Sequence, residues 1–158
     1  MAKLWGGRFK KKIDPDFEKF SASLEVDKRL LPYDLRIDAA HVMALKKCGV
    51  LTAAEAKKLL SAIRLLVARH RAGSLKLDAS QEDVHSAIQA LLKARLGDLA
   101  DKLHTARSRN DLVSQSTRLY ARENADTIYA MLTQAQKALV QKDEEYQEFY
   151  KHVAHDFD

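Results

Sequence analysis

The chain has 158 residues, of which 46% are hydrophobic and 31% charged, a balance ordinary for a globular protein and unlike that of a low-complexity chain. The formal net charge is +5, but basic and acidic residues are interspersed and few aromatics accompany them, which disfavours a nucleic-acid partner. The single cysteine, Cys48, excludes an internal disulfide and a cysteine-based metal site, and its apolar neighbours predict a buried thiol.

The first part of the chain is predicted to be an arm followed by a short helix. Residues 1–14 are irregular in pattern, and Trp5 and Phe9 would anchor such an arm on a neighbouring surface. Asp14 and Pro15 are typical of a helix start, with Asp as the N-cap and Pro in the first turn. Glycine and proline are otherwise scarce, which favours long helices over a turn-rich sheet protein.

A helical hairpin is predicted next. Apolar residues recur at helical spacing from about residue 27 to residue 47, with Gly49 as the expected C-terminal cap. The stripe in this helix is predicted to contain Leu30, Tyr33, Ile37, Ala40, Ala44 and Leu45. Thr52 and Glu55 form a capping box that opens a second helix, which is expected to end at Gly73.

A third helix is predicted from the capping signature at residues 80–83 to Gly97. Asp83 and His85 lie in its first turn, while Val84 faces the core. A carboxylate is expected at a helix start, because it interacts favourably with the helix dipole. A histidine is less expected there, and it is either a neutral hydrogen-bonding imidazole or a satisfied structural side chain.

The most concentrated polar chemistry lies in residues 102–111, where Arg107 to Asp111 run without an apolar break. A helix start offers unpaired backbone N–H groups and the positive end of the dipole. Two guanidiniums, a hydroxyl and an amide at such a place favour binding of a carboxylate or phosphate. A charged, solvent-facing helix start explains the same residues equally well.

A long helical pattern runs from about Thr105 towards the C-terminus without glycine or proline. Roughly 35–45 residues of helix would span some 50–65 Å. Its apolar stripe is Leu112, Ser116, Leu119, Ile128, Leu132, Ala135 and Leu139. A small domain cannot cover this length, so the pattern predicts a helical bundle completed by other chains or by further sequence. The predicted fold is all-α, with a helical domain over residues 1–103 and the first long helix of a central bundle over residues 104–158.

Three segments together resemble argininosuccinate lyase and its δ-crystallin relatives in the fumarase/aspartase superfamily. They are residues 4–9 (Leu-Trp-Gly-Gly-Arg-Phe), 82–86 (Glu-Asp-Val-His-Ser) and 102–111 (Lys-Leu-His-Thr-Ala-Arg-Ser-Arg-Asn-Asp), and the resemblance covers about residues 3–140. It implies a β-elimination of argininosuccinate to fumarate and arginine, with no metal and no organic cofactor. In that reaction a base removes a proton next to a carboxylate, the carbanion is held as an aci-carboxylate, and an acid protonates the departing guanidino nitrogen.

The resemblance also implies a set of substrate-binding residues. By position in the family's motifs, Ser23 and Asn110 are expected to contact substrate. Ser108 and Arg109 are expected to hold a carboxylate of its succinyl half. A dry pocket with such donors would stabilise the developing anion.

Neighbouring residues are expected to complete this pocket. The resemblance implies that Asp83 and His85 support or line it, and that Arg107 and Asp111 pair around the helix start. Leu112 stands where many members have glutamine, which is expected to alter the edge of the pocket.

The last part of the chain departs from the family. Members continue from the long helix into a Pro-Gly-Tyr-Thr-His-type motif with a catalytic histidine, whereas residues 151–158 here lack that context. Neither His152 nor His155 takes over the role, so no catalytic residue is assigned. The family's mobile serine-rich loop is absent as well. The chain therefore resembles an N-terminal portion with a divergent tail, and alone it is expected to be inactive.

The expected partners follow from the same resemblance. They are argininosuccinate, or fumarate and arginine, and further copies of the chain, because the family forms homotetramers whose active sites combine several subunits. No apolar run is long enough for a membrane span and no signal peptide is recognised, which predicts a cytoplasmic protein without a membrane partner. A non-catalytic helical oligomerisation protein, like a crystallin, is the alternative.

Overall fold

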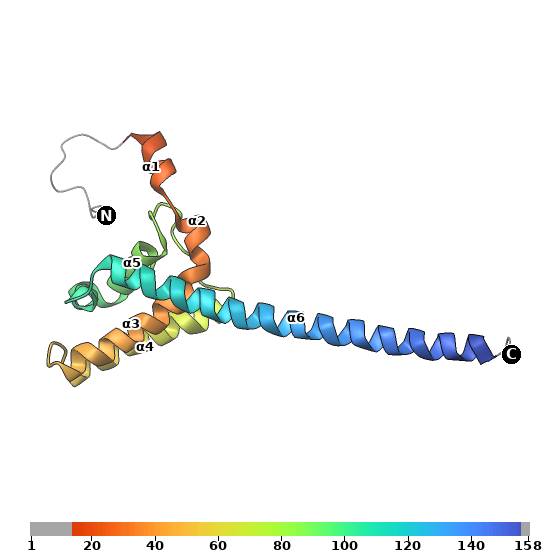
Figure 1. Cartoon of the computed structure of the whole chain (residues 1–158). Coiled ribbons are helices and arrows are strands. Elements are labelled where there is room, and N and C mark those ends of the chain that lie inside the picture. Colours follow the sequence, from red (N-terminus) through yellow and green to blue (C-terminus); the bar gives the residue numbers. More distant parts are fainter. Residues whose placement is uncertain (1–13, 156–158) are drawn as a thin grey trace. The chain divides into compact units, whose positions relative to one another are not determined.

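The computed structural model describes residues 14–155, and within that range the chain forms helices and no strand, which confirms the all-α prediction (Figure 1). The predicted arm, including Trp5 and Phe9, lies almost wholly outside the described residues. The elements in chain order are α1 (Pro15–Ser21), α2 (Leu24–Asp27), the 3-10 helix η1 (Lys28–Leu30), α3 (Leu31–Lys47), α4 (Ala53–Arg71), α5 (Val84–Leu96), the 3-10 helix η2 (Gly97–His104) and α6 (Arg109–His155).

The described chain divides into two compact units. The first ends at Thr117 and includes the first turns of α6, and the second begins at Arg118 and consists of the rest of that helix. The domain division after residue 103 stays a prediction, because the packing of a single chain does not test it.

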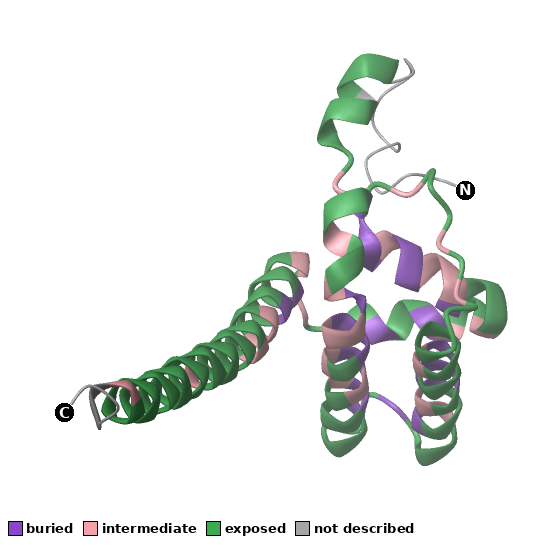
Figure 2. Ribbon diagram, turned by 90° about the vertical axis from the view of Figure 1, so that its right-hand side faces the viewer, coloured by how far each residue is buried: buried purple, intermediate pink, exposed green. Residues whose placement is uncertain are grey.

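The core belongs to the first unit. The α3–α4 hairpin packs together and α5 packs against both of its helices, as the buried ribbon segments in Figure 2 show. Seventeen apolar side chains share this core: Leu24, Leu31, Leu35, Val42, Leu45, Leu51, Ala56, Leu59, Ala62, Ile63, Leu66, Val84, Ala87, Ile88, Leu92, Ala100 and Leu103. Burial of these side chains supplies most of the stabilisation of the unit.

The predicted helix boundaries around α4 are confirmed. Thr52 Oγ1 accepts the Glu55 N–H at 3.2 Å, and Glu55 Oε2 accepts the Thr52 N–H at 2.9 Å, which completes the capping box. Gly49, Gly73 and Gly97 follow the three helices with φ values of 76°, 65° and 58°. This left-handed conformation is easily adopted only by glycine, so the helices end where the glycines stand.

The predicted inward stripe of α3 is wrong. Leu45 is buried as expected, but Ala40 and Ala44 are exposed, and Leu30, Tyr33 and Ile37 are only half-buried. The face that packs inward is Leu31, Asp34, Leu35, Asp38, Val42 and Leu45. The prediction counted only apolar residues, and the two buried aspartates therefore shifted it around the helix.

Cys48 is also a correction, because its thiol is exposed and not buried. The residue follows the last turn of α3 and directly precedes Gly49, whose left-handed backbone turns the chain towards α4. Burial resumes at Leu51, which is only 2% exposed. Leu45 and Leu51 thus pack into the core, whereas Cys48 and Val50 between them are exposed.

The long helix α6 has 47 residues and begins at Arg109, four residues after the predicted start at Thr105. Leu112 and Ser116 are buried in the first unit. Leu119, another member of the predicted stripe, is half-buried. Beyond Tyr120 the described helix has nine exposed large apolar side chains, with fractions between 57% and 75%: Ile128, Tyr129, Met131, Leu132, Leu139, Val140, Tyr146, Phe149 and Tyr150. Within the described residues, no helix combines the length and the apolar character that crossing a membrane requires.

The capping box makes a pH-dependent contribution to stability. Lys102 Nζ lies 2.5 Å from Glu55 Oε1, and this contact and the bonds from Thr52 lower the pKa of Glu55 from 4.5 to about 2. A carboxyl whose pKa is lowered on folding stabilises the fold above pH 4.5, and this stabilisation is lost as the pH falls towards 2. We therefore predict that Glu55→Gln destabilises the chain at pH 7 and has little effect near pH 2, as measured by urea denaturation followed by circular dichroism.

The control for that measurement is Glu82→Gln. Glu82 is exposed and its side chain makes no ion pair within the described part of the chain. This change is expected to alter stability little at either pH. Equal destabilisation by Glu55→Gln at pH 7 and at pH 2 would contradict the role of the charged carboxylate.

Candidate functional site

The candidate site is centred on the start of α6. Ser108 is its N-cap: Ser108 Oγ accepts the Asn110 N–H at 3.2 Å, and Asp111 Oδ2 accepts the Ser108 N–H at 3.0 Å. These reciprocal bonds satisfy two backbone donors and explain why the helix begins at Arg109 rather than at Thr105. The side chains of Ser108 and Asn110 remain exposed, so both are accessible to a ligand.

Arg109 joins this helix start to the start of α5. One of its guanidinium nitrogens, Nη2, pairs with Asp83 Oδ2 and also donates to Ser86 Oγ at 3.3 Å. The Arg109 side chain is 29% exposed, whereas that of Asp83 is 10% exposed. The guanidinium is therefore held from one side by α5 and is partly open to solvent on the other. A planar donor held in this way is suited to a bidentate contact with a carboxylate.

Asp83 performs two tasks at once. Its Oδ1 atom accepts the Ser86 N–H at 2.8 Å and so caps α5, while Oδ2 faces Arg109. The pattern of residues 80–83 predicted a helix start here with Asp83 in its first turn, whereas Asp83 is the N-cap and the helix begins at Val84. The second task depends on the packing of α5 beside the start of α6, which no local pattern reveals.

Ser23 lies next to Asp83 along a backbone contact. The N–H groups of Ser23 and Leu24 both donate to the Glu82 carbonyl, at 2.8 and 3.2 Å. The Ser23 hydroxyl donates to the Asp27 carboxylate and makes no side-chain capping bond to α2. Ser23 thus stands at the N-cap position of α2 without a side-chain capping bond, and its role as a substrate contact stays a prediction.

His85 points away from Arg109. Its Nδ1 atom pairs with Asp34 Oδ2 of α3, and the two side chains are 5% and 0% exposed. The imidazole is therefore a buried partner of a buried carboxylate. Its predicted role in supporting or lining the pocket stays a prediction, and in this arrangement a supporting contact fits better than a direct one.

A second buried ion pair lies beside the first. Arg107 Nη2 and Asp38 Oδ1 are 2.7 Å apart, and the side chains are 7% and 4% exposed. Burial raises the pKa of the Asp38 carboxyl above its usual value, and Asp34 adds to the rise, whereas Arg107 and His85 oppose it. Four ionisable groups, Asp34, Asp38, His85 and Arg107, thus form one buried cluster behind the helix start.

The sequence reasoning missed both aspartates of this cluster. Their signal was an Asp at i and at i+4 within the apolar pattern of α3, between Leu31 and Val42. Arg107 was expected to pair around the helix start with Asp111, but its partner is Asp38, and Asp111 instead accepts the Ser108 N–H. Leu112, expected at the pocket edge, is buried.

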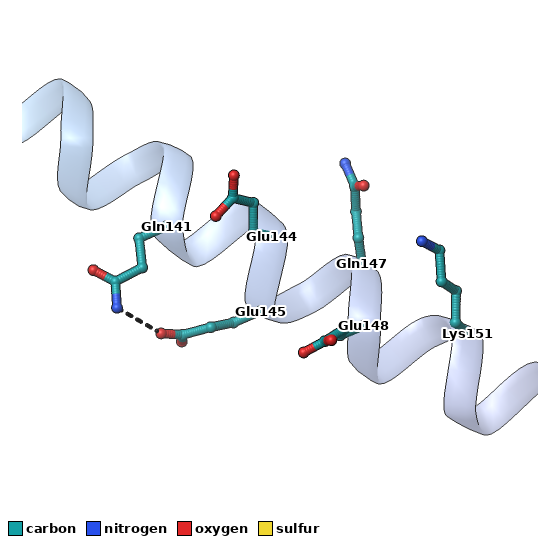
Figure 3. A pocket seen from close by; sticks show the side chains of 6 residues that line it. All are labelled: Gln141, Glu144, Glu145, Gln147, Glu148 and Lys151. Atoms are coloured by element: carbon teal, nitrogen blue, oxygen red, sulfur yellow. Dashed lines mark hydrogen bonds between the residues drawn. The ribbon is translucent and has the colours of Figure 1, made fainter.

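Other candidate sites have less support. Among residues 14–155, no group of three or more histidine, cysteine or acidic side chains is placed to hold a metal ion. A hollow on the distal part of α6, shown in Figure 3, is lined by side chains of that one helix: Gln141, Glu144, Glu145, Gln147, Glu148 and Lys151. All six are exposed, so nothing there removes a ligand from water, and we place the candidate site at the start of α6.

Comparison with known proteins gives a family match over most of the chain. A family model described as "Lyase" matches residues 7–152. The chain is 44% identical over 138 residues to the argininosuccinate lyase of Methylococcus capsulatus, an alignment that covers 87% of this chain and 30% of that protein. It is 40% identical over 140 residues to the argininosuccinate lyase of Desulforudis audaxviator, covering 89% of this chain and 30% of that protein.

The match extends further in a third relative. The argininosuccinate lyase of a Geobacillus species is 38% identical over 148 residues, which is 94% of this chain and 32% of that protein. The chain thus spans about 30% of the length of the curated relatives it matches. Since the family model reaches residue 152, the similarity continues beyond the residues 3–140 that the motifs indicated.

The two tasks of Asp83 can be separated by substitution. We predict that Asp83→Asn keeps the cap on α5, because the asparagine side-chain oxygen still accepts the Ser86 N–H, and loses only the ion pair with Arg109. Asp83→Ala loses both, and it should be less stable than Asp83→Asn by about 1 kcal/mol. Urea denaturation at pH 7 measures the difference.

The control is Ser86→Ala, which removes the hydroxyl that accepts from Arg109 but leaves the backbone N–H that donates to Asp83. It should leave the cap intact and resemble Asp83→Asn more than Asp83→Ala. Equal stability of the two Asp83 variants would show that the cap contributes nothing.

Proposed function

The chain belongs to the lyase family whose model matches residues 7–152, and from this premise we propose that it is part of an argininosuccinate lyase, with one edge of the substrate site at the start of α6. The argument depends chiefly on one observation. Arg109 is held by Asp83 and Ser86 at a helix start where the Ser108 and Asn110 side chains remain exposed. Donors of this kind are suited to binding a succinyl carboxylate.

The proposed reaction is the β-elimination that releases fumarate and arginine. Removing a proton next to a carboxylate places a second negative charge on that group, and donors fixed in advance stabilise it. The Arg109 guanidinium and the donors of Ser108 and Asn110 would hold the carboxylate as this charge develops. Ser23, near Asp83, would contact the same substrate, while Asp83 and His85 would support the edge from behind.

We expect the isolated chain not to catalyse the reaction. No group among the site residues is in a position to be assigned as the base or the acid. The catalytic-histidine motif expected for the family does not occur in the 158 residues. The edge formed by Ser108, Arg109 and Asn110 would thus bind the substrate without transferring its protons.

A second role is favoured by the exposed apolar side chains of α6. Ile128, Leu132 and Leu139 lie at helical spacing and are 57%, 60% and 71% exposed. Such a stripe is normally covered by another helix. We propose that copies of the chain associate through it into a homo-oligomer, a tetramer in the assembled enzyme. A purely structural, crystallin-like protein would use the same stripe, and ligand binding distinguishes it from the lyase.

The test of the substrate site is a titration with argininosuccinate followed by NMR. We predict shifts of the Ser108, Arg109 and Asn110 amides in the wild type and their loss in Arg109→Gln. Arg95→Gln is the matched control, because Arg95 is an exposed arginine in the last turn of α5, whereas the proposed edge lies by the first turn of that helix. Fumarate release, followed by its ultraviolet absorbance, should stay at the background rate throughout.

Two results would contradict the proposal. Shifts that persist unchanged in Arg109→Gln would place the ligand elsewhere. Fumarate release at the rate of a full-length relative would show that the chain contains its own proton-transfer groups. Binding without turnover would separate this chain from a purely structural protein.

The assembly is tested at the stripe itself. We predict that the wild type is oligomeric in solution and that Leu132→Asp dissociates it, because a buried unpaired carboxylate is costly. Lys137→Asp is the control, since five residues further along the helix its side chain lies about 140° from that of Leu132. Size-exclusion chromatography with light scattering gives the mass of each variant. A monomeric wild type at high concentration would contradict this role.

A further inference from the structure

The turn just before α6 contains a backbone conformation that its residue does not favour. Ala106 has φ 55°, and it is the one non-glycine residue with positive φ in the part of the chain that the structure describes. In this left-handed region the alanine Cβ crowds the following carbonyl oxygen. Such a conformation persists when surrounding contacts hold it in place.

Contacts from α3 hold the residues on both sides of Ala106. His41 Nε2 donates to the Thr105 carbonyl at 3.0 Å, and Asp38 pairs with Arg107 at 2.7 Å. Asp38 and His41 are three residues apart in α3, so they lie on the same face of that helix. One face of α3 therefore contacts the residue immediately before Ala106 and the residue immediately after it.

Arg107 pairs with Asp38 in surroundings that exclude water. The Arg107 and Asp38 side chains are almost completely buried, so water does not replace either partner. The nearby Asp34 is already paired with His85. Asp38 is therefore the counter-charge that keeps Arg107, and with it the turn, in place.

We propose that Asp38 and His41 are positioning residues, which hold the left-handed turn at Ala106 and thereby fix the direction in which Ser108, Arg109 and Asn110 face the ligand. This inference rests on the proposed function for its biological meaning. Its structural content does not rest on that function. The contacts of His41 with Thr105 and of Asp38 with Arg107, here called the clamp, are present in the chain without a ligand. A simple packing role for Asp38 would stabilise α3 without any link to the conformation of residue 106.

Backbone order parameters from ¹⁵N relaxation test the clamp in the full chain. In the wild type we expect values near 0.85 for residues 106–110, and in Asp38→Asn and His41→Ala a fall in these residues towards about 0.6. Residues 56–66 of α4 are the internal reference and should not change. Lys93→Gln, which breaks the exposed Lys93–Asp101 ion pair at 2.7 Å, is the matched control and should leave residues 106–110 unchanged.

A positioning role predicts that Ala106→Gly reduces the loss of backbone order caused by His41→Ala. Glycine adopts this φ without the Cβ contact. In the Gly background, His41→Ala should lower the order parameters of residues 107–110 by clearly less than it does in the presence of Ala106. A residue that merely packs α3 would show the same fall in both backgrounds.

Each outcome decides the matter. Unchanged order at residues 106–110 in both variants, an equal loss in α4, or the absence of rescue would overturn the inference. Asp38→Asn leaves Arg107 buried without its carboxylate, so circular dichroism must show that it is folded, and if it is not, His41→Ala with and without Ala106→Gly decides alone.

A separate titration with succinate distinguishes this inference from the proposed function. Loss of order in the variants, with no succinate binding to the wild type, would leave the clamp standing and refute the carboxylate site. Succinate binding to the wild type and to variants whose order parameters are unchanged would support the carboxylate site and refute the clamp.

Discussion

The buried ion pair between Asp38 and Arg107 is the interaction on which the candidate site depends. Removing one partner of such a pair typically costs about 3–5 kcal/mol, because the other charge stays buried and uncompensated. In this chain the pair does more than stabilise, since Arg107 precedes the cap of α6 by a single residue. The position of the helix start is therefore tied to α3, which lies about seventy residues earlier in the sequence.

The cluster around this pair joins three parts of the first unit. Asp34 and Asp38 come from α3, His85 from the first turn of α5, and Arg107 from the turn before α6. On the solvent side of the same region, Asp83 caps α5 and pairs with Arg109. Asp83, the cap of α5, thus supports the arginine proposed to face the ligand, while His85, two residues later, pairs with the buried Asp34.

The sequence predicts this architecture where one local rule acts alone. The capping box at Thr52 and the helix-ending glycines were identified correctly, because side-chain caps and positive φ leave short-range patterns. The inward face of α3 was predicted wrongly, because Asp34 and Asp38 occupy core positions. Their partners, His85 and Arg107, lie far away in the sequence. For the same reason the sequence did not indicate Asp38 as the partner of Arg107. The six predicted substrate residues came from motif resemblance, and residue types alone would not have separated them from a solvated helix start.

The helix α6 has a partly buried first part and a largely exposed remainder. Its first turns are fixed by packing in the first unit, where Leu112 and Ser116 are buried, and by the cap at Ser108. Its remaining length exposes large apolar side chains that no other described part of the chain covers. The start of the helix is thus held by contacts within the first unit, whereas an apolar stripe of this size is normally covered by another helix. The proposed substrate edge and the proposed assembly surface therefore lie on the same helix but depend on different contacts.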